Sequence, residues 1–503
     1  MSKKSRFFRD GAMLTAVSLC SRSVSIVFSS LLAGWVGSEG VGLFTLIMTV
    51  YAFGITFATS GIGLTVTRLV AANYERRCGI LSASLLYSSA FGSAATLILF
   101  IFAPFIANHL MHTSEGARLL MILAPTLILA AISATFNGYF VGVKRVRANA
   151  IAQTFGQALK IVVSCTLVAI WGRGGKTSSL ELICVSFLIT EFFSFILILI
   201  LYFIDTKNHP NKEKNKAKLG EISAVALPLA FSQYVRSLLL SFEHILIPRR
   251  LVFGGLSESE ALSGYGVLHG MALPTLLFPM SPLSSYSGLL VPEFAEDESR
   301  GDKERMSRLT SYAINMTLIY ATAVAAFIFF FSEDLGYALY NSFDAGRYLR
   351  ILALVVPIMY LDHVTDQILK GIGEQVYSMW VNIADSCLSL VLVFFLLPRL
   401  GVMGYALVII IMEAFNFLMS LSRLLTRVKV RVKPLSAMLF PLIFSSLACH
   451  ISGKLFAFGG ASSRTPWLIC KIIVAICIFV FFDRLVKSFL CNLNKSKKRQ
   501  KNP

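Results

Sequence analysis

The chain has 503 residues, of which 56% are hydrophobic and 15% are charged, and its formal net charge is +19. This composition is too apolar for a soluble globular protein. Apolar runs of about 18 or more residues recur along the chain and are typical of membrane-spanning helices. Segments of roughly 10 residues with alternating polarity, which would indicate a membrane β-barrel, are absent.

We therefore predict an all-α integral membrane protein with about 14 transmembrane helices. The predicted spans are 11–36, 43–66, 80–107, 118–142, 150–171, 180–204, 222–247, 263–291, 309–331, 347–369, 376–397, 402–422, 435–452 and 467–482. A short basic head, Lys3-Lys4-Ser5-Arg6, precedes the first span. We interpret that span as a retained helix and not as a cleaved signal peptide.

The lysines and arginines are distributed unevenly between the two sides of the membrane. Most of the 46 lie in the N-terminal head and in alternate connections, namely 67–79, 144–147, 205–220, 292–308, 423–434 and the tail 483–503. The positive-inside rule places these connections and both termini in the cytoplasm, in the bacterial cytoplasmic membrane. The basic tail is interpreted as a topology anchor on anionic lipid, so we expect membrane lipids and no nucleic acid as partners.

Several chemistries lack their usual sequence signals. The nine cysteines include no CxxC pair and no Cys/His metal spacing, so we expect neither structural disulfides nor a metal site. The chain contains no Walker A sequence and no GxSxG. Its connections are too short to fold into an ATPase or a glycosyltransferase domain. We expect a protein that is not an enzyme and needs no cofactor.

An internal repeat indicates the architecture. Gly40-Val41-Gly42-Leu43-Phe44 resembles Gly264-Tyr265-Gly266-Val267-Leu268, and Phe140-Val141-Gly142-Val143 matches Leu369-Lys370-Gly371-Ile372 in position. The spacing of six helices is even, so the two halves would be parallel copies with a substrate path between them. The predicted regions are an N-terminal six-helix lobe (1–204), a cytoplasmic linker (205–221), a second six-helix lobe (222–422), two additional helices (435–482) and the basic tail (483–503).

Two arginines lie at equivalent mid-helix positions of the two halves. Arg22 is midway along the first span, and Arg236 is midway along the seventh. A charge in the middle of the bilayer is costly, so these side chains should face a cavity or a partner. Guanidinium groups match phosphate oxygens, so the pair would suit a pyrophosphate. The alternative is that each arginine pairs with an acidic residue and holds helices together.

Further charges lie near or within the predicted spans. Glu243 follows Arg236 by seven residues on the same helix face, where it could line the same path. Asp362, Asp366 and Lys370 share a face, with His363 adjacent. We regard Asp362, His363 and Asp366 as ion-coupling candidates, and helix stabilisation as the alternative. For five single charges we favour helix packing or snorkelling, and these are Glu191, Lys160, Asp385, Glu413 and Lys471.

The eighth span contains three prolines, Pro274, Pro279 and Pro282. Each proline removes a backbone donor, so the segment cannot form a regular straight helix. We expect a bent, partly hydrated helix beside the Arg236 helix, and the alternative is a simple kink.

The middle of the chain resembles a known group. The runs FEHILIPRRL, GLSESEALSGYGVLHGMALP and LVPEFAE, and later LKGIGEQVYSMWVNI, look like the stage V sporulation protein B group. That group belongs to the polysaccharide-exporter branch of the multidrug/oligosaccharidyl-lipid/polysaccharide superfamily, which also holds lipid II flippases. The resemblance implies a fold of two six-helix lobes with two extra helices, and a lipid-linked saccharide as substrate. The chain departs from the lipid II flippases in having a single arginine on span 1 and no basic residue on span 2.

We hypothesise a flippase that moves an undecaprenyl-pyrophosphate-linked oligosaccharide or peptidoglycan precursor outward by alternating access. The candidate substrate-binding residues are Arg22, Arg236, Glu243, Arg249 and Arg250. The expected partners are the lipid-linked saccharide and, beside it, glycosyltransferases or cell-wall synthesis proteins. Two alternatives remain, a cation-coupled multidrug exporter on the same scaffold and a non-transporting scaffold for cell-wall assembly.

Overall fold

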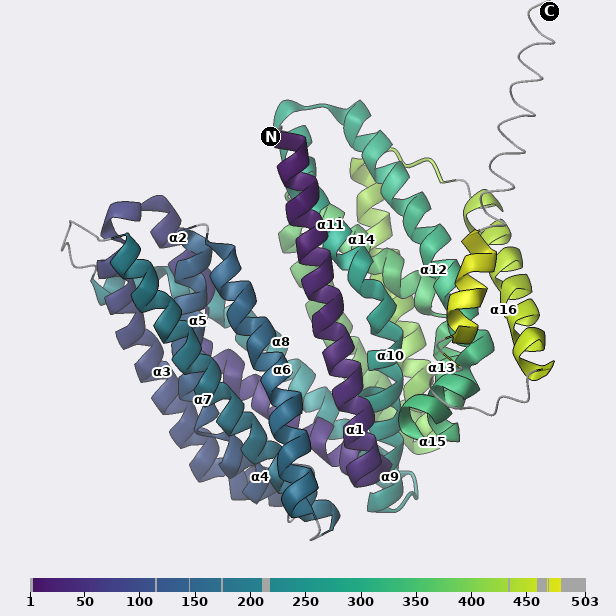
Figure 1. The fold of residues 1–503 in the computed structure, drawn as a ribbon, viewed down its shortest axis with the longest axis horizontal. Coiled ribbons are helices and arrows are strands. Elements are labelled where there is room, and N and C mark those ends of the chain that lie inside the picture. The colour runs from purple at the N-terminus through teal and green to yellow at the C-terminus, as the bar shows by residue number, and fades with distance from the viewer. Residues whose placement is uncertain are drawn as a thin grey trace, which may run out of the picture. The chain divides into compact units, whose positions relative to one another are not determined.

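The computed structural model describes residues 3–113, 115–143, 145–172, 175–209, 218–432, 435–458, 468 and 470–480. All regular elements in these ranges are helical, which confirms the predicted fold class (Figure 1). The basic tail 483–503, residues 210–217 of the predicted linker and parts of the last predicted span lie outside the described residues. Helices suit a bilayer because each satisfies its own backbone hydrogen bonds where no water can.

The helices follow one another with short connections. In chain order they are α1 (Lys3–Thr59), α2 (Ile62–Ala72), α3 (Arg77–Phe105), α4 (Gly116–Leu123), α5 (Thr126–Gly142), α6 (Val146–Trp171), α7 (Lys176–Asn208), α8 (Leu219–Phe253), α9 (Glu258–Tyr265), α10 (Leu273–Leu277), α11 (Ser281–Arg300), α12 (Lys303–Tyr340), α13 (Phe343–Ala353), α14 (Val356–Gly371), α15 (Gln375–Arg427) and α16 (Phe440–Phe458). Short turns of tighter or wider helix lie between them, at Tyr74–Arg76, Ile106–Met111, Gly266–Ala272, Phe278–Met280 and Leu435–Leu439.

Within the described residues, nine helical stretches are long and apolar enough to cross a membrane, and two bent helix pairs bring the number to eleven. Two of the stretches each hold two predicted spans. In α1 the two arms meet at Gly37, whose φ is 70°, and in α15 they meet at Gly401, whose φ is 61°. Glycine adopts this left-handed conformation without steric cost, so the chain turns there without a longer loop. The stretches therefore account for the first thirteen predicted spans.

The eighth predicted span is broken, as its prolines predict. The chain passes from α9 through a π-helical turn at Gly266–Ala272 into α10, and then through a 3-10 turn at Phe278–Met280 into α11. A hydroxyl satisfies one of the carbonyls that the prolines free, since Ser281 Oγ donates to Phe278 O, four residues before Pro282. The expectation of an irregular helix is confirmed.

The helices form two compact units. The N-terminal unit comprises residues 20–266 and 386–405, and the C-terminal unit comprises residues 1–19, 267–385 and the described part of 406–503. In the N-terminal unit α5 packs against α2, α3 and α7, and α8 packs against α2 and α3. In the C-terminal unit α12 packs against α13, α14 and α16. The boundaries of the two predicted lobes remain a prediction.

The order of elements repeats along the chain. A break before Pro125 separates α4 from α5, and a break before Pro357 separates α13 from α14 with a 60° bend. The helices after these breaks end in equivalent glycines, Gly142 and Gly371. This recurrence agrees with the parallel six-helix repeats that the glycine motifs predict.

Two repeat-related glycines touch each other in the N-terminal unit. A Cβ added to Gly42 would lie 1.9 Å from Leu262 O, and a Cβ added to Gly266 would lie 2.3 Å from Ser38 O. Leu262 is the repeat equivalent of Ser38, so the two contacts are reciprocal. Reciprocal contacts between equivalent residues are the mark of a two-fold axis. The repeat therefore includes a pseudo-two-fold crossing at which only glycine fits.

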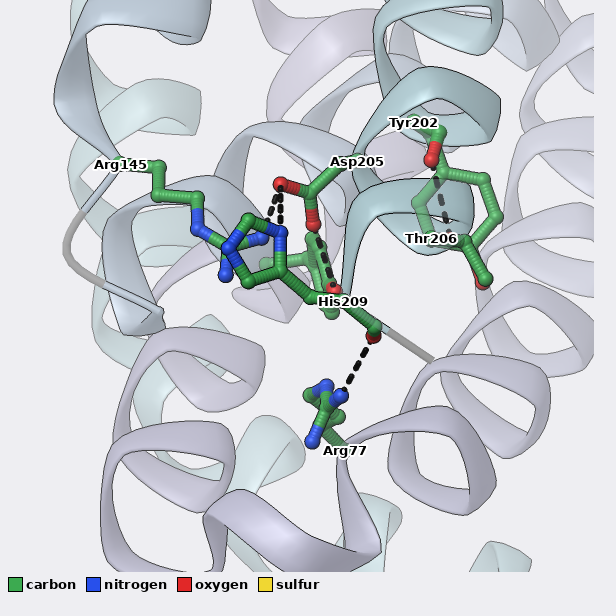
Figure 2. A network of polar contacts seen from close by, with 7 residues as sticks. Arg77, Arg145, Tyr202, Asp205, Thr206 and His209 are labelled. Atoms are coloured by element: carbon green, nitrogen blue, oxygen red, sulfur yellow. Dashed lines mark hydrogen bonds and ion pairs between the residues drawn. The ribbon is translucent and has the colours of Figure 1, made fainter. Parts of the chain in front are cut away.

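The predicted cytoplasmic connections of the N-terminal unit meet in one polar network (Figure 2). Buried Asp205 accepts hydrogen bonds from Arg145 and from the Tyr139 hydroxyl, the latter at 3.1 Å. Its Oδ1 lies 4.0 Å from His209 Nδ1, and Arg77 Nη2 donates to the His209 carbonyl at 2.9 Å. These residues come from three alternate connections or their flanking helix ends, so these connections lie on one side, as the charge pattern predicts.

Glu374 links two helix ends in the C-terminal unit. Its carboxylate accepts hydrogen bonds from Arg423 at 2.9 Å and forms an ion pair with Arg427. Partial burial raises the pKa of this carboxyl, but the two arginines outweigh burial and hold the pKa below its usual value. These contacts tie the start of α15 to its end. The two ends belong to different arms of α15, which meet at Gly401.

Candidate functional site

The two mid-helix arginines lie on α1 and α8, both within the N-terminal unit. Arg22 is half-buried and interacts with another group of the chain. Arg236 is exposed, and among the described residues it has no hydrogen bond or ion pair. The alternative of an acidic partner therefore does not hold for Arg236 in this part of the chain. An exposed guanidinium midway along a membrane helix requires water or an anionic ligand.

The position of Arg236 is set by the helix that carries it. The two arms of α8, Leu219–Pro228 and Gln233–Phe253, are bent by 47°. Proline produces such a bend because it lacks a backbone donor and its ring displaces the preceding turn. Just beyond the bend, the Tyr234 hydroxyl donates to Ser60 Oγ at 2.6 Å, which fixes α8 beside the break between α1 and α2.

Glu243 and its neighbour His244 are engaged with protein groups. Glu243 accepts a hydrogen bond from the Ser389 hydroxyl on the first arm of α15. His244 Nδ1 lies 3.1 Å from the hydroxyl of Tyr265, the last residue of α9. These contacts join α8 to α9 and α15 within the N-terminal unit. Glu243 and His244 therefore help to hold these helices together. The role of Glu243 on the substrate path remains a prediction.

Arg249 and Arg250 lie at the end of α8, opposite to the end that holds the predicted cytoplasmic connection. Arg249 Nη2 donates to the His109 carbonyl at 2.9 Å and lies 2.6 Å from His112 Nε2. Arg250 donates twice to the Phe394 carbonyl and lies 3.8 Å from the centroid of that ring. Both guanidinium groups are thus satisfied by the protein, and their proposed contact with substrate stays a prediction.

The ion-coupling candidates lie on α14 in the C-terminal unit and differ from one another. Asp366 forms an ion pair with Lys370 at 2.5 Å, one helical turn away. Asp362 Oδ1 is buried without a hydrogen-bond partner among the described residues. His363 Nε2 is buried in the same way, although its ring has another interaction. The face predicted for these residues therefore has a neutralised end at Asp366. At Asp362, one carboxylate oxygen has no hydrogen bond among the described residues, although the carboxylate also has a hydrogen bond with Ser420.

Two further carboxylates, which the sequence presents as isolated charges, interact with Asp362. Glu413 on the second arm of α15 interacts electrostatically with Asp362 and with Asp385 on the first arm. Three carboxylates so arranged within membrane helices cannot all stay ionised without a proton or a cation among them. The common depth of these residues in their spans is the signal that could have grouped them.

The helices of the N-terminal unit that correspond to α14 and the two arms of α15 carry a different set of polar residues. The spacing of Gly142 and Gly371 aligns Asn137 with Asp366 and Ser133 with Asp362. Asn137, Lys160 and Glu191 lie on α5, α6 and α7. They line a cavity of about 410 Å³ between the second arm of α1, α5, α6 and α7. Lys471, by contrast, forms an ion pair with Asp334 at 2.5 Å, in keeping with helix packing.

Comparisons with known proteins agree with this architecture. The family model described as "Polysaccharide biosynthesis protein" matches residues 7–296, and the MatE model matches residues 236–395. Stage V sporulation protein B of Bacillus subtilis (strain 168) is 23% identical over 420 residues, which is 81% of each chain. Sporulation protein YkvU of the same organism is 20% identical over 353 residues, 69% of this chain and 78% of that one.

Two solved structures share the fold. The structure titled "Lipid II flippase MurJ, inward closed conformation" has a TM-score of 0.73 at 15% identity and covers 95% of this chain and 100% of its own. An inward-facing multidrug resistance MATE family transporter of the MOP superfamily has a TM-score of 0.64 at 17% identity, over 80% of this chain and 95% of its own. The likeness extends over both predicted repeats.

Proposed function

The chain belongs to the polysaccharide biosynthesis protein family, and we propose that it is a flippase for a lipid-linked saccharide. In this proposal the cargo is an undecaprenyl-pyrophosphate-linked oligosaccharide or peptidoglycan precursor that moves outward across the cytoplasmic membrane. The protein is a multi-pass membrane protein with the fold shared by flippases and multidrug transporters. The lipid-linked cargo is the finer inference, and it is supported by the names of the relatives and by the polar groups within the membrane helices.

Arg236 is the observation that carries the proposal. Its guanidinium is exposed midway along a bent membrane helix, without a protein partner among the described residues. A pyrophosphate offers several oxygens as hydrogen-bond acceptors. A guanidinium binds such oxygens through paired N–H donors, and this binding is stronger and more specific than the attraction of a point charge. Arg22, Glu243, Arg249 and Arg250 complete the proposed substrate path, with Arg22 as the second phosphate ligand.

The carboxylates of the C-terminal unit support an ion-coupled cycle. Asp362 interacts with Asp385, and Glu413 interacts with both. Uptake of a proton or cation would relieve their repulsion, and release would restore it. We propose that this exchange, with His363 beside Asp362 and Asp366 nearer the helix end, couples an ion gradient to the alternation of access.

A second candidate function, cation-coupled export of drugs, is favoured by the same acidic cluster and by the MATE likeness. It requires an acidic surface for a cationic cargo. The exposed arginine on α8 opposes it, because a cationic cargo would be repelled there.

Reconstituted vesicles test the proposal through arginine variants. We expect Arg236→Ala to slow translocation of a fluorescent lipid-linked disaccharide by about tenfold or more, the loss of one charge-assisted contact. Arg236→Lys should recover part of the rate, since charge returns without the paired geometry. Arg308→Ala, which removes an exposed arginine paired with Glu304, is the matched control. Unchanged translocation in both Arg22→Ala and Arg236→Ala would overturn the proposal that these two arginines bind the pyrophosphate.

A further inference from the structure

The cavity of the N-terminal unit contains polar groups that helix packing does not explain. It lies among the second arm of α1, α5, α6 and α7 and has a volume of about 410 Å³. A volume of about 300–1,000 Å³ is typical of small-molecule sites. Lys160 is near the middle of the span Ile151–Trp171, and Glu191 is near the middle of Ser178–Asn208. The cavity is therefore at mid-membrane depth, where ionisable groups are costly and are usually functional.

Several lining atoms lack a partner. Asn137 Oδ1, Gln157 Oε1 and Ser133 Oγ are buried, and among the described residues none of them has a hydrogen bond. Buried polar atoms in native proteins are nearly always satisfied, by protein, water or ligand. Amide oxygens accept hydrogen bonds, so the missing partner must donate. Hydroxyl groups, water and ammonium groups are the available donors.

Lys160 decides between these donors. Its ammonium lies 3.5 Å from the centroid of the Phe187 ring, at the edge of the cavity. A cationic ligand would be repelled by this ammonium, and the repulsion is strong where water is scarce. Glu191 offsets the charge of Lys160 and disfavours an anionic ligand in the same way. The lining therefore suits an uncharged ligand that both donates and accepts hydrogen bonds.

The second half of the repeat provides the contrast. On α5, α6 and α7 the N-terminal unit has Asn137, Lys160 and Glu191, and on the corresponding helices the C-terminal unit has Asp362, Asp385 and Glu413. The amide and the ammonium replace two carboxylates, so the net charge changes from negative to zero. The corresponding helices thus suit a cation in one half and a neutral polar group in the other.

We propose that this cavity binds the saccharide head of the cargo. Sugar hydroxyls donate to Asn137 Oδ1 and Gln157 Oε1, and a sugar oxygen accepts from Lys160. The volume admits a small saccharide, and the apolar lipid stays outside. The inference rests on the proposed function for the identity of the cargo, while the binding of a neutral saccharide can be measured without transport.

Binding of free neutral disaccharides to the full-length protein in lipid nanodiscs tests the site. Saturation-transfer NMR with maltose and with N,N′-diacetylchitobiose should give signals with at least one of them. Asn137→Leu and Gln157→Met keep the side-chain volume and remove the acceptors, and each should weaken binding about tenfold, as expected for one lost hydrogen bond. Asn108→Leu, which alters an exposed amide of the same unit outside the cavity, should bind as the wild type does.

Two outcomes would overturn the site: no saturation transfer from the wild type to either disaccharide, or equal affinity in wild type and in both cavity variants. Each variant is accepted only when it is monodisperse, and the second cavity variant serves if the first fails to fold. The proposed function is tested separately, by transport. A wild type that binds disaccharide but moves no lipid-linked saccharide would refute the flippase and leave the site intact.

Discussion

The acidic side chains of α14 show how different two neighbouring carboxylates can be. Asp366 is neutralised by Lys370, whereas Asp362 interacts with Asp385 and Glu413 and has one oxygen without a hydrogen bond among the described residues. We expect Asp362→Asn to reduce gradient-stimulated transport by roughly tenfold or more, within the range of typical coupling energies. Asp366→Asn should have a small effect, because the cluster around Asp362 is kept. Transport by vesicles with and without an imposed ion gradient measures both, and equal losses in the two variants would contradict this assignment.

Glu374 gives a prediction on pH dependence. Its carboxyl has a folded-state pKa below the usual 4.5 because Arg423 and Arg427 favour the charged form. A lowered folded-state pKa stabilises the folded protein above the unfolded-state value, and this stabilisation is lost as the pH falls through the folded-state pKa. Glu374→Gln should therefore lower the thermal midpoint at pH 7, with a loss of roughly 1.5–3 kcal/mol for a charge-assisted hydrogen bond.

At pH 4 and below, the wild type should approach the Glu374→Gln variant in thermal stability. Glu304→Gln is the control, because Glu304 is exposed and pairs with the exposed Arg308. A difference between wild type and Glu374→Gln that stays constant from pH 7 to pH 4 would show that the ionised carboxylate does not stabilise this end of α15.

At the scale of elements, the crossing of Gly42 and Gly266 is the most sharply defined contact. Either glycine, changed to alanine, would place a methyl group within 1.9–2.3 Å of a backbone oxygen. Such overpacking costs typically about 1–3 kcal/mol. We expect Gly42→Ala and Gly266→Ala each to lower the thermal midpoint, and the double variant to lose less than the sum, because both act on one crossing.

Gly220→Ala is the matched control for this crossing. Gly220 lies in α8 with open space around its Cα, and alanine favours a helix more than glycine does. It should leave stability unchanged or raise it slightly. Additive losses in the double variant would indicate that Gly42 and Gly266 do not share a contact.

The elements also show what the sequence could and could not predict. The broken eighth span was predicted from proline chemistry and is confirmed. The bend of α8 after Pro228 has the same physical cause but was not predicted. The interactions among Asp362, Asp385 and Glu413 were not predicted. Each residue lies on a different helix or helix arm, and spacing along one chain cannot show which faces of separate helices meet.

At the scale of the whole molecule, composition and charge predict most of the transmembrane organisation. Apolar length predicts the spans, and the distribution of lysine and arginine predicts which connections share a side. The Asp205 network brings three of those connections together, which the charge pattern anticipates. The sequence could not predict that Lys160 and Glu191 line one cavity, because two single charges on separate helices read equally well as packing residues.

The central claim is that the chain moves a lipid-linked saccharide. The most direct test is translocation in vesicles that contain the purified full-length protein, with a fluorescent undecaprenyl-pyrophosphate-linked disaccharide in one set and a cationic dye in another. We expect the disaccharide lipid to cross several times faster than in protein-free vesicles, while the dye moves at the protein-free rate. Export of the dye without movement of the lipid would contradict the claim in favour of a drug exporter, and no movement of either would contradict it in favour of a scaffold.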